Sequence, residues 1–270
     1  GVQIEGFDLS NSPKDYAPRR VKGRVVCFTT TNGTKALMKC KNNSKNSGRS
    51  STSSKIYIGA FCNLSAVARK ILDDDDDDVG GTIHIVCAGS DGQVCGEDVL
   101  FAGALCEQLM LRQNNNDGKL GGEESSSSDP LLFFEDSARI AMHQWKEETG
   151  GVGYPVVDNE IVQNLGSGSG DEDRRRHGHG HGHDVATVKQ TIEGQLHTAL
   201  RQTKGGRGLV ELGPSYEDDI DIVAQIDTHD LVGVYQKQPQ EKTSDGDDDD
   251  DDNDQQNGDD DYRPSIIVAM

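Results

Sequence analysis

A run of hydroxyl and amide side chains stands at a predicted strand-to-helix junction, in the sequence TTTNGT at 29–34. Its glycine lets backbone amides approach a ligand closely, and its side chains can donate hydrogen bonds to oxygen atoms. The run predicts a cradle for an oxyanion such as phosphate, to which Lys35 adds positive charge. The alternative is a plain helix cap or bend, since such residues are common there. The candidate catalytic donors are Thr30, Thr31, Asn32, Gly33 and Thr34.

Two adjacent carboxylates, Glu97 and Asp98, follow a second loop, AGSDGQVCGED at 88–98. Carboxylate oxygens are the ligands that Mg²⁺ prefers, so both are candidate metal ligands and Mg²⁺ is the expected cofactor. An anion cradle beside carboxylates indicates phosphate chemistry. A structural role is again the alternative, because acids in the first turn of a helix complement its dipole.

Alternating strand and helix patterns must position these loops. The predicted strands are 23–30, 55–63 and 81–90. The helical patterns that follow them are 33–40, 64–72 and 96–112. This order predicts an α/β fold with a layered, largely parallel sheet flanked by helices. The loops at the carboxyl ends of such strands meet, which would bring 29–34 and 88–98 together.

The second half of the chain continues with helical patterns and one more strand. The predicted helices are 129–145, 184–203 and 215–227. A glycine-rich segment at 205–213 separates the last two helices, and a strand is predicted at 231–235. These elements extend the same α/β domain rather than starting another.

Low-complexity segments interrupt the domain. The chain has 270 residues, of which 33% are hydrophobic, and this is a lean content for a globular protein. The predicted solvated insertions are 41–54, 73–81, 113–128 and 165–184. We therefore predict a single domain over 1–236, an acidic disordered segment at 237–261 and a C-terminal tail at 262–270. The tract HGHGHGH at 177–183 alternates strictly with glycine, which gives no fixed ligand geometry and favours repeat expansion over a metal site.

Charge and cysteine content restrict the class of protein. Most of the net charge of −20 comes from the aspartate runs, which argue against nucleic acid as a ligand. Six cysteines without a CxxC pair indicate free thiols in a reducing, cytoplasmic setting. No apolar run is long enough to span a bilayer, so no membrane partner is expected. The oligomeric state stays open, and a homo-oligomer is one alternative.

Several blocks of the sequence, running in one order, resemble the 2-phosphosulfolactate phosphatase family. The blocks are GFDLSNSP (6–13), TTNGTKAL (30–37), IVCAGSDG with EDVLFAGAL (85–105), DSARIA (136–141) and LVELGPSYEDDIDIVAQID (209–227). The resemblance implies an α/β layered domain particular to that family. It also implies Mg²⁺-dependent hydrolysis of (R)-2-phospho-3-sulfolactate to 3-sulfolactate and phosphate, a step associated with coenzyme M synthesis.

The resemblance supplies further candidate site residues. A small substrate with phosphate, carboxylate and sulfonate groups needs its charge neutralised by metal and basic side chains. The additional acidic candidates from the matched blocks are Asp8, Asp218, Asp219 and Asp227. The basic candidates for the carboxylate or sulfonate are Lys35, Arg139 and Arg207. Each has a structural alternative, such as a surface ion pair between Asp136 and Arg139.

The chain also departs from the pattern of that family. Family members carry a further Asp-Val-Leu-Arg-Ala-like stretch ahead of GFDLSNSP, so we expect this chain to lack an upstream part. Thr203 stands where a serine is usual. The alternative function is therefore that of a non-catalytic relative that binds a phosphorylated metabolite or a protein partner.

Overall fold

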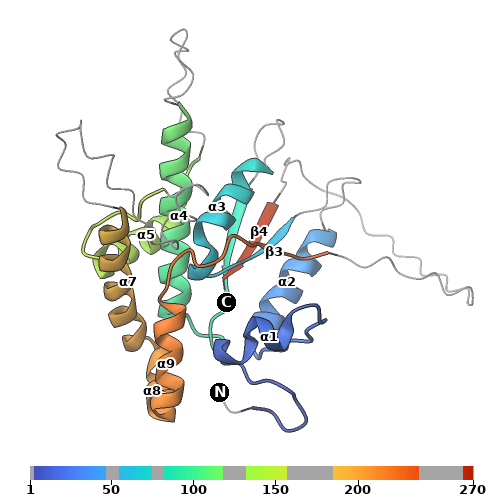
Figure 1. The fold of residues 1–270 in the computed structure, drawn as a ribbon. Helices are drawn as coiled ribbons and strands as arrows, with labels where there is room; N and C mark the ends of the chain where they lie inside the picture. Colours follow the sequence, from blue (N-terminus) through green and yellow to red (C-terminus); the bar gives the residue numbers. More distant parts are fainter. Residues whose placement is uncertain are drawn as a thin grey trace, which may run out of the picture.

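The computed structural model describes residues 3–46, 55–74, 82–117, 132–156, 185–236 and 264–269, whose fold is shown in Figure 1. The longer helices are α2 (Gly33–Asn46), α3 (Leu64–Asp73), α4 (Gly96–Asp117), α5 (Asp136–Glu148), α7 (Val185–Gln202), α8 (Lys204–Leu212) and α9 (Pro214–Val223). The short helical turns are η1 (Pro13–Tyr16), α1 (Pro18–Val21) and η2 (Phe61–Asn63). The strands are β1 (Ile56–Gly59), β2 (Thr82–Cys87), β3 (Gly233–Val234) and β4 (Pro264–Ala269).

The strands form one small sheet in the order β2-β4-β1-β3. Strand β4 pairs in parallel with both β1 and β2, whereas β3 pairs with β1 in the antiparallel direction. The predicted α/β class is confirmed as helices combined with this sheet, which is mixed in direction. The predicted tail at 262–270 is corrected, because most of it forms β4 inside the sheet. Its short apolar run gave no sign of a pairing partner, since the partners lie far away in the sequence.

Alternate side chains of β1 enter two apolar clusters, as expected for a pleated strand between packed layers. Tyr57 is buried in the main core together with residues of α3 and α4. Ile56 is buried in a second cluster with Ala36 and Cys40 of α2. The helix that follows TTTNGT is thereby fixed against the sheet, and this packing sets the position of the loop.

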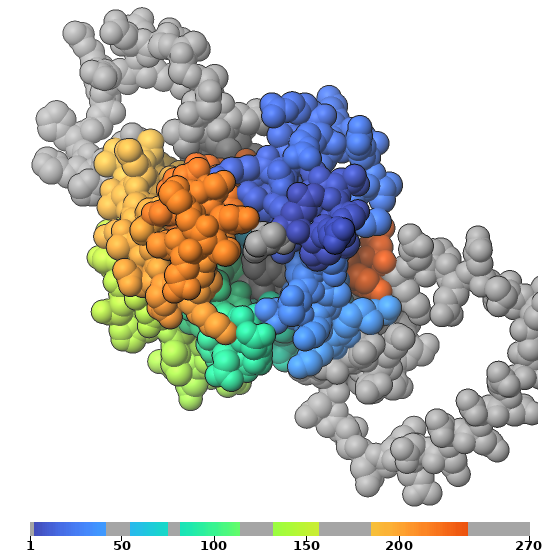
Figure 2. Space-filling model, turned by 90° about the horizontal axis from the view of Figure 1, so that it is seen from below, coloured from blue at the N-terminus to red at the C-terminus, as the bar shows by residue number. Residues whose placement is uncertain are grey.

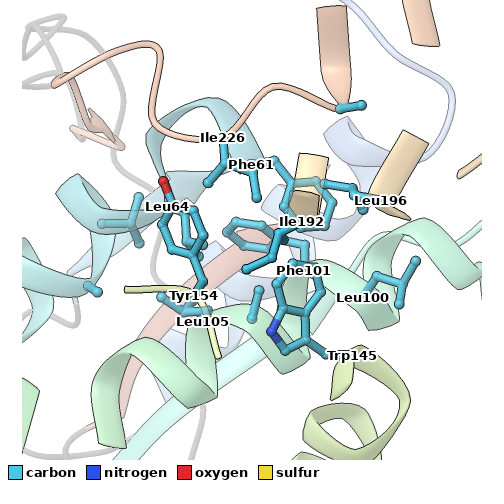
Figure 3. Close-up of a cluster of buried hydrophobic side chains, with 14 of the residues drawn as sticks. Phe61, Leu64, Leu100, Phe101, Leu105, Trp145, Tyr154, Ile192, Leu196 and Ile226 are labelled. Atoms are coloured by element: carbon cyan, nitrogen blue, oxygen red, sulfur yellow. The ribbon is translucent and has the colours of Figure 1, made fainter. Parts of the chain in front are cut away.

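Aromatic side chains fill the centre of the main core, as Figure 3 shows. The ring of Phe61 stacks on Trp145 with centroids 5.8 Å apart, and its edge contact with Phe101 has centroids 5.6 Å apart. The indole Nε1 of Trp145 donates a hydrogen bond of 2.9 Å to Glu107 Oε2, which satisfies its buried polar atom. Helix α5 therefore packs against α4 and supports it behind its first turn.

One predicted strand is not formed. Residues 24–30 form neither a helix nor a strand, residue 23 lies in a turn, and the segment pairs with no strand among the described residues. Val25 is 95% exposed and Phe28 is 51% exposed, so the predicted buried strand at 23–30 is corrected. An apolar β-branched run favours extended backbone by itself, but a strand also needs a neighbour to pair with.

Helix boundaries differ from the predictions mainly at the insertions. Helix α2 continues to Asn46 and α4 to Asp117, so both run into predicted insertions, at 41–54 and 113–128. In the aspartate run at 73–81, Asp74 accepts hydrogen bonds from Tyr57 Oη at 2.5 Å and Lys70 Nζ. Asp73 ends helix α3, whereas 75–81 lie outside the described residues, as do all of 165–184 and 237–261 and the His-Gly tract.

Two further differences concern helices in the second half. The helix predicted at 129–145 begins only at Asp136, as α5, and the glycine-rich segment at 205–213 forms helix α8. Helices α7 and α9 lie close to their predicted ranges of 184–203 and 215–227. All six cysteines are free thiols, as predicted. Among the described helices, none is both long and apolar enough to cross a bilayer.

Candidate functional site

The starts of helices α2, α4 and α8 meet around the loop at 88–95, which joins β2 to α4. The backbone N–H of Asp91 points to Asn32 Oδ1 at a long distance of 3.5 Å. From the other side, Lys204 Nζ lies 3.4 Å from Ser90 Oγ and 3.3 Å from Asp91 Oδ2. Figure 2 shows the blue N-terminal segments, the teal start of α4 and the orange helices α8 and α9 around one face. We call residues 30–35, 89–91, 97–98 and 203–205 the candidate site.

The TTTNGT loop is held by a reciprocal pair of threonines. The backbone N–H of Thr34 donates to Thr30 Oγ1 at 3.0 Å, and the N–H of Thr30 donates to Thr34 Oγ1 at 3.2 Å. These bonds cap the start of α2, as the structural alternative for this loop expected. Each hydroxyl accepts in this arrangement, so its own proton stays available to a ligand. Thr31, Thr34 and Lys35 are exposed, whereas Gly33 is buried.

Left-handed backbone shapes the loop at 88–95. Gly89 has φ +66° and Asp91 has φ +54°, and Ser90 and Gln93 exchange backbone hydrogen bonds of 3.0 and 2.9 Å. A Cβ atom at Gly89 would lie 2.4 Å from Gln93 O, so only glycine fits there. The N–H of Gly89 is thereby directed at Asp98 Oδ2, at 2.6 Å.

The two predicted carboxylates on the first turn of α4 lie in the candidate site. Asp98 is buried, and this burial raises the pKa of its carboxyl; the nearby Glu97 raises that pKa further, while the bond from Gly89 opposes them. Glu97 Oε2 is buried without a hydrogen-bond partner among the described residues. A buried carboxylate oxygen without a donor is unfavourable unless a cation or another ligand reaches it.

These carboxylates fit a magnesium ion that is shared with a substrate. Among the described residues, no three His, Cys, Asp or Glu side chains gather into a group that could hold a metal ion. Mg²⁺, however, is commonly bound by one or two carboxylates together with water and substrate phosphate oxygens. The buried, unpartnered oxygen of Glu97 beside Asp98 suits that sparse kind of site.

The other predicted metal ligands have structural partners instead. Asp227 Oδ1 and Oδ2 accept from the N–H and hydroxyl of Ser65 at 2.7 and 2.6 Å, which caps the start of α3. Asp219 accepts from Ser12 Oγ at 2.7 Å, and Asp218 lies 3.1 Å from Lys14 Nζ. The latter two acids attach the N-terminal segment to α9. The structure does not bring these three side chains together with Glu97 and Asp98 as one metal group.

A cavity of about 940 Å³ lies next to the TTTNGT loop and is lined by residues from 3 to 31. Asp8, also a predicted metal ligand, is exposed and lines this cavity. Thr31 lines it as well, together with Arg19 and Arg24, so the cavity has a cationic wall. The unpaired segment at 23–30 forms part of the same wall.

Of the basic residues at the site, sequence reasoning missed Lys204. The predicted Arg207 donates instead to the carbonyl of Gln202, and the predicted Arg139 is exposed on α5. Lys204 is the first residue of α8, directly after Thr203, whose Oγ1 accepts from Gly206 N at 3.1 Å. A threonine therefore fills the capping role in place of serine. The cap was a detectable signal for the helix start, but nothing local indicated that this start faces Asp91.

Asp98→Asn tests whether the buried negative charge of Asp98 lowers the stability of the fold. The pKa of Asp98 in the folded protein is raised above its ordinary value of 3.8. The free energy of unfolding therefore falls as the pH rises from that ordinary pKa through the raised one, because the buried carboxyl ionises. Asparagine keeps an acceptor for Gly89 N–H without the charge. We expect a higher melting temperature than wild type at pH 7, and a much smaller difference near pH 3. Calorimetric melting at both pH values checks this, and a lower melting temperature for Asp98→Asn at pH 7 would contradict it.

Comparison with known proteins finds similarity to 2-phosphosulfolactate phosphatases. The family model for 2-phosphosulpholactate phosphatase matches residues 1–149. A probable 2-phosphosulfolactate phosphatase of Caldanaerobacter subterraneus is 45% identical over 107 residues, which are 40% of this chain and 38% of the relative. Proteins of the same description from Clostridium botulinum strain Alaska E43 and from Thermotoga maritima are 40% and 35% identical. Each of these two matches covers 114 residues, 42% of this chain and 42% of the relative.

The matched region is only part of those relatives. The chain spans about two fifths of the length of the curated relatives it matches, 38% to 42% for the three named above. No solved structure matches the chain. The family match includes α2, β2 and α4, and with them Asn32, Asp91 and Asp98, but it ends before Lys204.

Proposed function

Because the chain belongs to the 2-phosphosulpholactate phosphatase family, we propose that it hydrolyses (R)-2-phospho-3-sulfolactate to 3-sulfolactate and phosphate. The observation that carries this proposal is the meeting of three helix starts, with hydroxyl groups and a lysine, beside two adjacent carboxylates. Such a site suits a small phosphomonoester with several negative charges. Within this proposal the reaction serves coenzyme M synthesis in the cytoplasm.

The start of α2 would bind the phosphoryl group. Free backbone N–H groups and the positive end of the helix dipole favour an anion there. The hydroxyl protons of Thr30 and Thr34, which are not used in the cap, would donate to phosphoryl oxygens, and Asn32 lies between them. Donors that are already in place stabilise the charge that the oxygens gain as the P–O bond to the leaving group loosens.

Glu97 and Asp98 would hold Mg²⁺, with Asp98 oriented by the N–H of Gly89. When bound, such an ion neutralises phosphate charge and polarises the phosphoryl group. Glu97 Oε2 is the oxygen without a donor, so it is the better placed of the two for direct coordination. Burial raises the pKa of Asp98, and a bound cation would lower that pKa again. The chain itself contributes orientation of the ester and exclusion of water from the buried carboxyl of Asp98.

Phosphate release from 2-phosphosulfolactate should require Mg²⁺. We expect turnover with added Mg²⁺ and a loss to background when excess EDTA removes it, because two carboxylates alone repel the anionic substrate. A phosphate-release assay with metal re-addition measures this, and Asp98→Asn is the matched variant that should stay inactive at any Mg²⁺ concentration. Full turnover in EDTA contradicts the metal assignment. Ligand binding with no release at any metal concentration favours the non-catalytic alternative.

A further inference from the structure

Lys204 is a basic side chain from the second half of the chain that reaches the candidate site. Its ammonium lies 3.3 Å from Asp91 Oδ2 and 3.4 Å from Ser90 Oγ, across 113 and 114 residues of sequence. A Cβ atom on the next residue, Gly205, would lie 2.6 Å from Glu97 Oε1. The start of α8 is therefore packed directly against the predicted metal ligand Glu97, and Lys204 contacts the neighbouring loop at 88–95.

The contacts of Lys204 are loose enough to be exchanged. Both distances exceed the roughly 2.7–2.9 Å that is usual for a charge-assisted hydrogen bond. The side chains of Lys204 and Asp91 are 53% and 74% exposed, so water and salt screen their attraction. An ammonium held this weakly can leave Asp91 for a ligand that carries a stronger or better placed negative charge.

The basic residues predicted for this task are less suitable. Arg207 is engaged with the carbonyl of Gln202, which precedes its own helix. Arg139 is exposed on α5, and no contact joins it to the loop at 88–95 within the described residues. Lys35 is exposed on the first turn of α2, where it is close to the expected phosphoryl position rather than opposite it.

We propose that Lys204 is a specificity-determining residue that binds the carboxylate or sulfonate of the substrate, and that Asp91 holds it in place until the substrate arrives. The phosphoryl group would lie at the start of α2, and the second anion would extend toward α8. This inference rests on the proposed function for its ligand class, a small organic acid with two anionic groups besides the phosphoryl ester. It predicts that monoesters without a second anion bind poorly.

Calorimetric titration with 3-sulfolactate measures this contact without any hydrolysis. We expect Lys204→Gln to weaken binding about 10-fold and Lys204→Arg to keep most of the affinity, because the positive charge is retained. Lactate lacks the sulfonate and isethionate lacks the carboxylate. If Lys204 contacts the sulfonate, Lys204→Gln should not change the affinity for lactate. If it contacts the carboxylate, Lys204→Gln should not change the affinity for isethionate. Lys39→Gln, which removes an exposed lysine of α2, is the matched control and should bind like wild type.

Asp91→Asn distinguishes two roles of Lys204, which are binding the ligand and only joining α8 to the loop at 88–95. Asparagine tolerates the positive φ of this position and removes the carboxylate that competes for Lys204. The proposal therefore expects Asp91→Asn to bind 3-sulfolactate more tightly, whereas Lys204→Gln binds it more weakly. If Lys204 served only to tie α8 to the loop, both variants would weaken binding alike, and this result would overturn the proposal.

The remaining outcomes distinguish this inference from the proposed function. Wild-type affinity in Lys204→Gln, or no binding of 3-sulfolactate by wild type, overturns the role of Lys204. A wild-type protein that binds 3-sulfolactate through Lys204 but releases no phosphate from the ester supports the contact and refutes the phosphatase proposal. Phosphate release that is unaffected by Lys204→Gln, in both kcat and KM, refutes the contact alone.

Discussion

Replacing Asn32 by alanine is expected to lower kcat for phosphate release about 100-fold to 1,000-fold, which is the typical effect of losing one preorganised donor, about 2.7–4 kcal/mol. Asn32 lies between the two capping threonines, and its Oδ1 faces Asp91 N–H at 3.5 Å. That bond is too long to contribute much stability. Most of the expected effect therefore falls on the reaction, and the melting temperature should change little. Steady-state kinetics and thermal melting of the same preparations measure both quantities.

Two comparison variants make the result for Asn32 interpretable. Asn32→Asp keeps an acceptor toward Asp91 but loses the amide donor, so it should be as slow as Asn32→Ala. Thr34→Val removes a hydroxyl that accepts from Thr30 N–H, so it should also cost about 1 kcal/mol of stability as a lost cap. Near-normal kcat in Asn32→Ala, with an earlier melting transition, would show that TTTNGT is a structural turn. The phosphate site would then have to be sought around Glu97 and Asp98.

Replacing Gly103 by alanine is expected to destabilise the fold by about 3 kcal/mol, in the upper part of the usual range for overpacking. Gly103 is in the buried face of α4, where α5 passes closest. A Cβ atom there would lie 2.1 Å from Ala141 O and 2.8 Å from Trp145 Cβ. A backbone carbonyl cannot move aside without displacing α5, so the cost exceeds the roughly 1 kcal/mol that alanine gains over glycine in a helix. Chemical denaturation measures the free energy of unfolding.

Gly194→Ala is the matched control for the helix α4 variant. Gly194 is also inside a helix, α7, but it is exposed, and a Cβ atom there would meet nothing within 4 Å. Alanine should therefore stabilise the protein by about 1 kcal/mol through helix propensity alone. Opposite signs for the two variants are the expected result. Equal stabilisation by both would mean that α4 and α5 do not approach as closely as the structure shows.

The Gly103→Ala variant also reports on how the candidate site is supported. Helix α4 carries Glu97 and Asp98 on its first turn, and Trp145 of α5 packs against the same helix through Glu107. A displaced α5 would let the start of α4 move. Gly103→Ala should therefore reduce phosphate release even under conditions in which the protein is still folded. A Cβ atom at Gly194 meets nothing within 4 Å, so Gly194→Ala should not displace this support.

The sequence by itself determined those helices and strands in which the apolar pattern of the element's own residues indicates which side chains are buried. Apolar helical patterns gave α3, α4, α7 and α9 nearly at their observed ranges, because each of these helices contributes buried apolar side chains to the common core. The same local evidence identified β1 and β2. Turn chemistry indicated an unusual loop at TTTNGT, and the acids after the second loop identified Glu97 and Asp98 as neighbours in one turn of helix.

Only the tertiary structure decided which of these elements touch. A strand pattern at 23–30 found no partner, whereas the short run at Pro264–Ala269 entered the middle of the sheet. Asp227 resembled Asp98 as an acid in a matched block, but it caps α3 through Ser65. Lys204 lies 113 residues from Asp91 in sequence and 3.3 Å from it in space. Local patterns record whether a side chain is buried or charged, but partners are chosen by the packing of the whole chain, which no single segment contains.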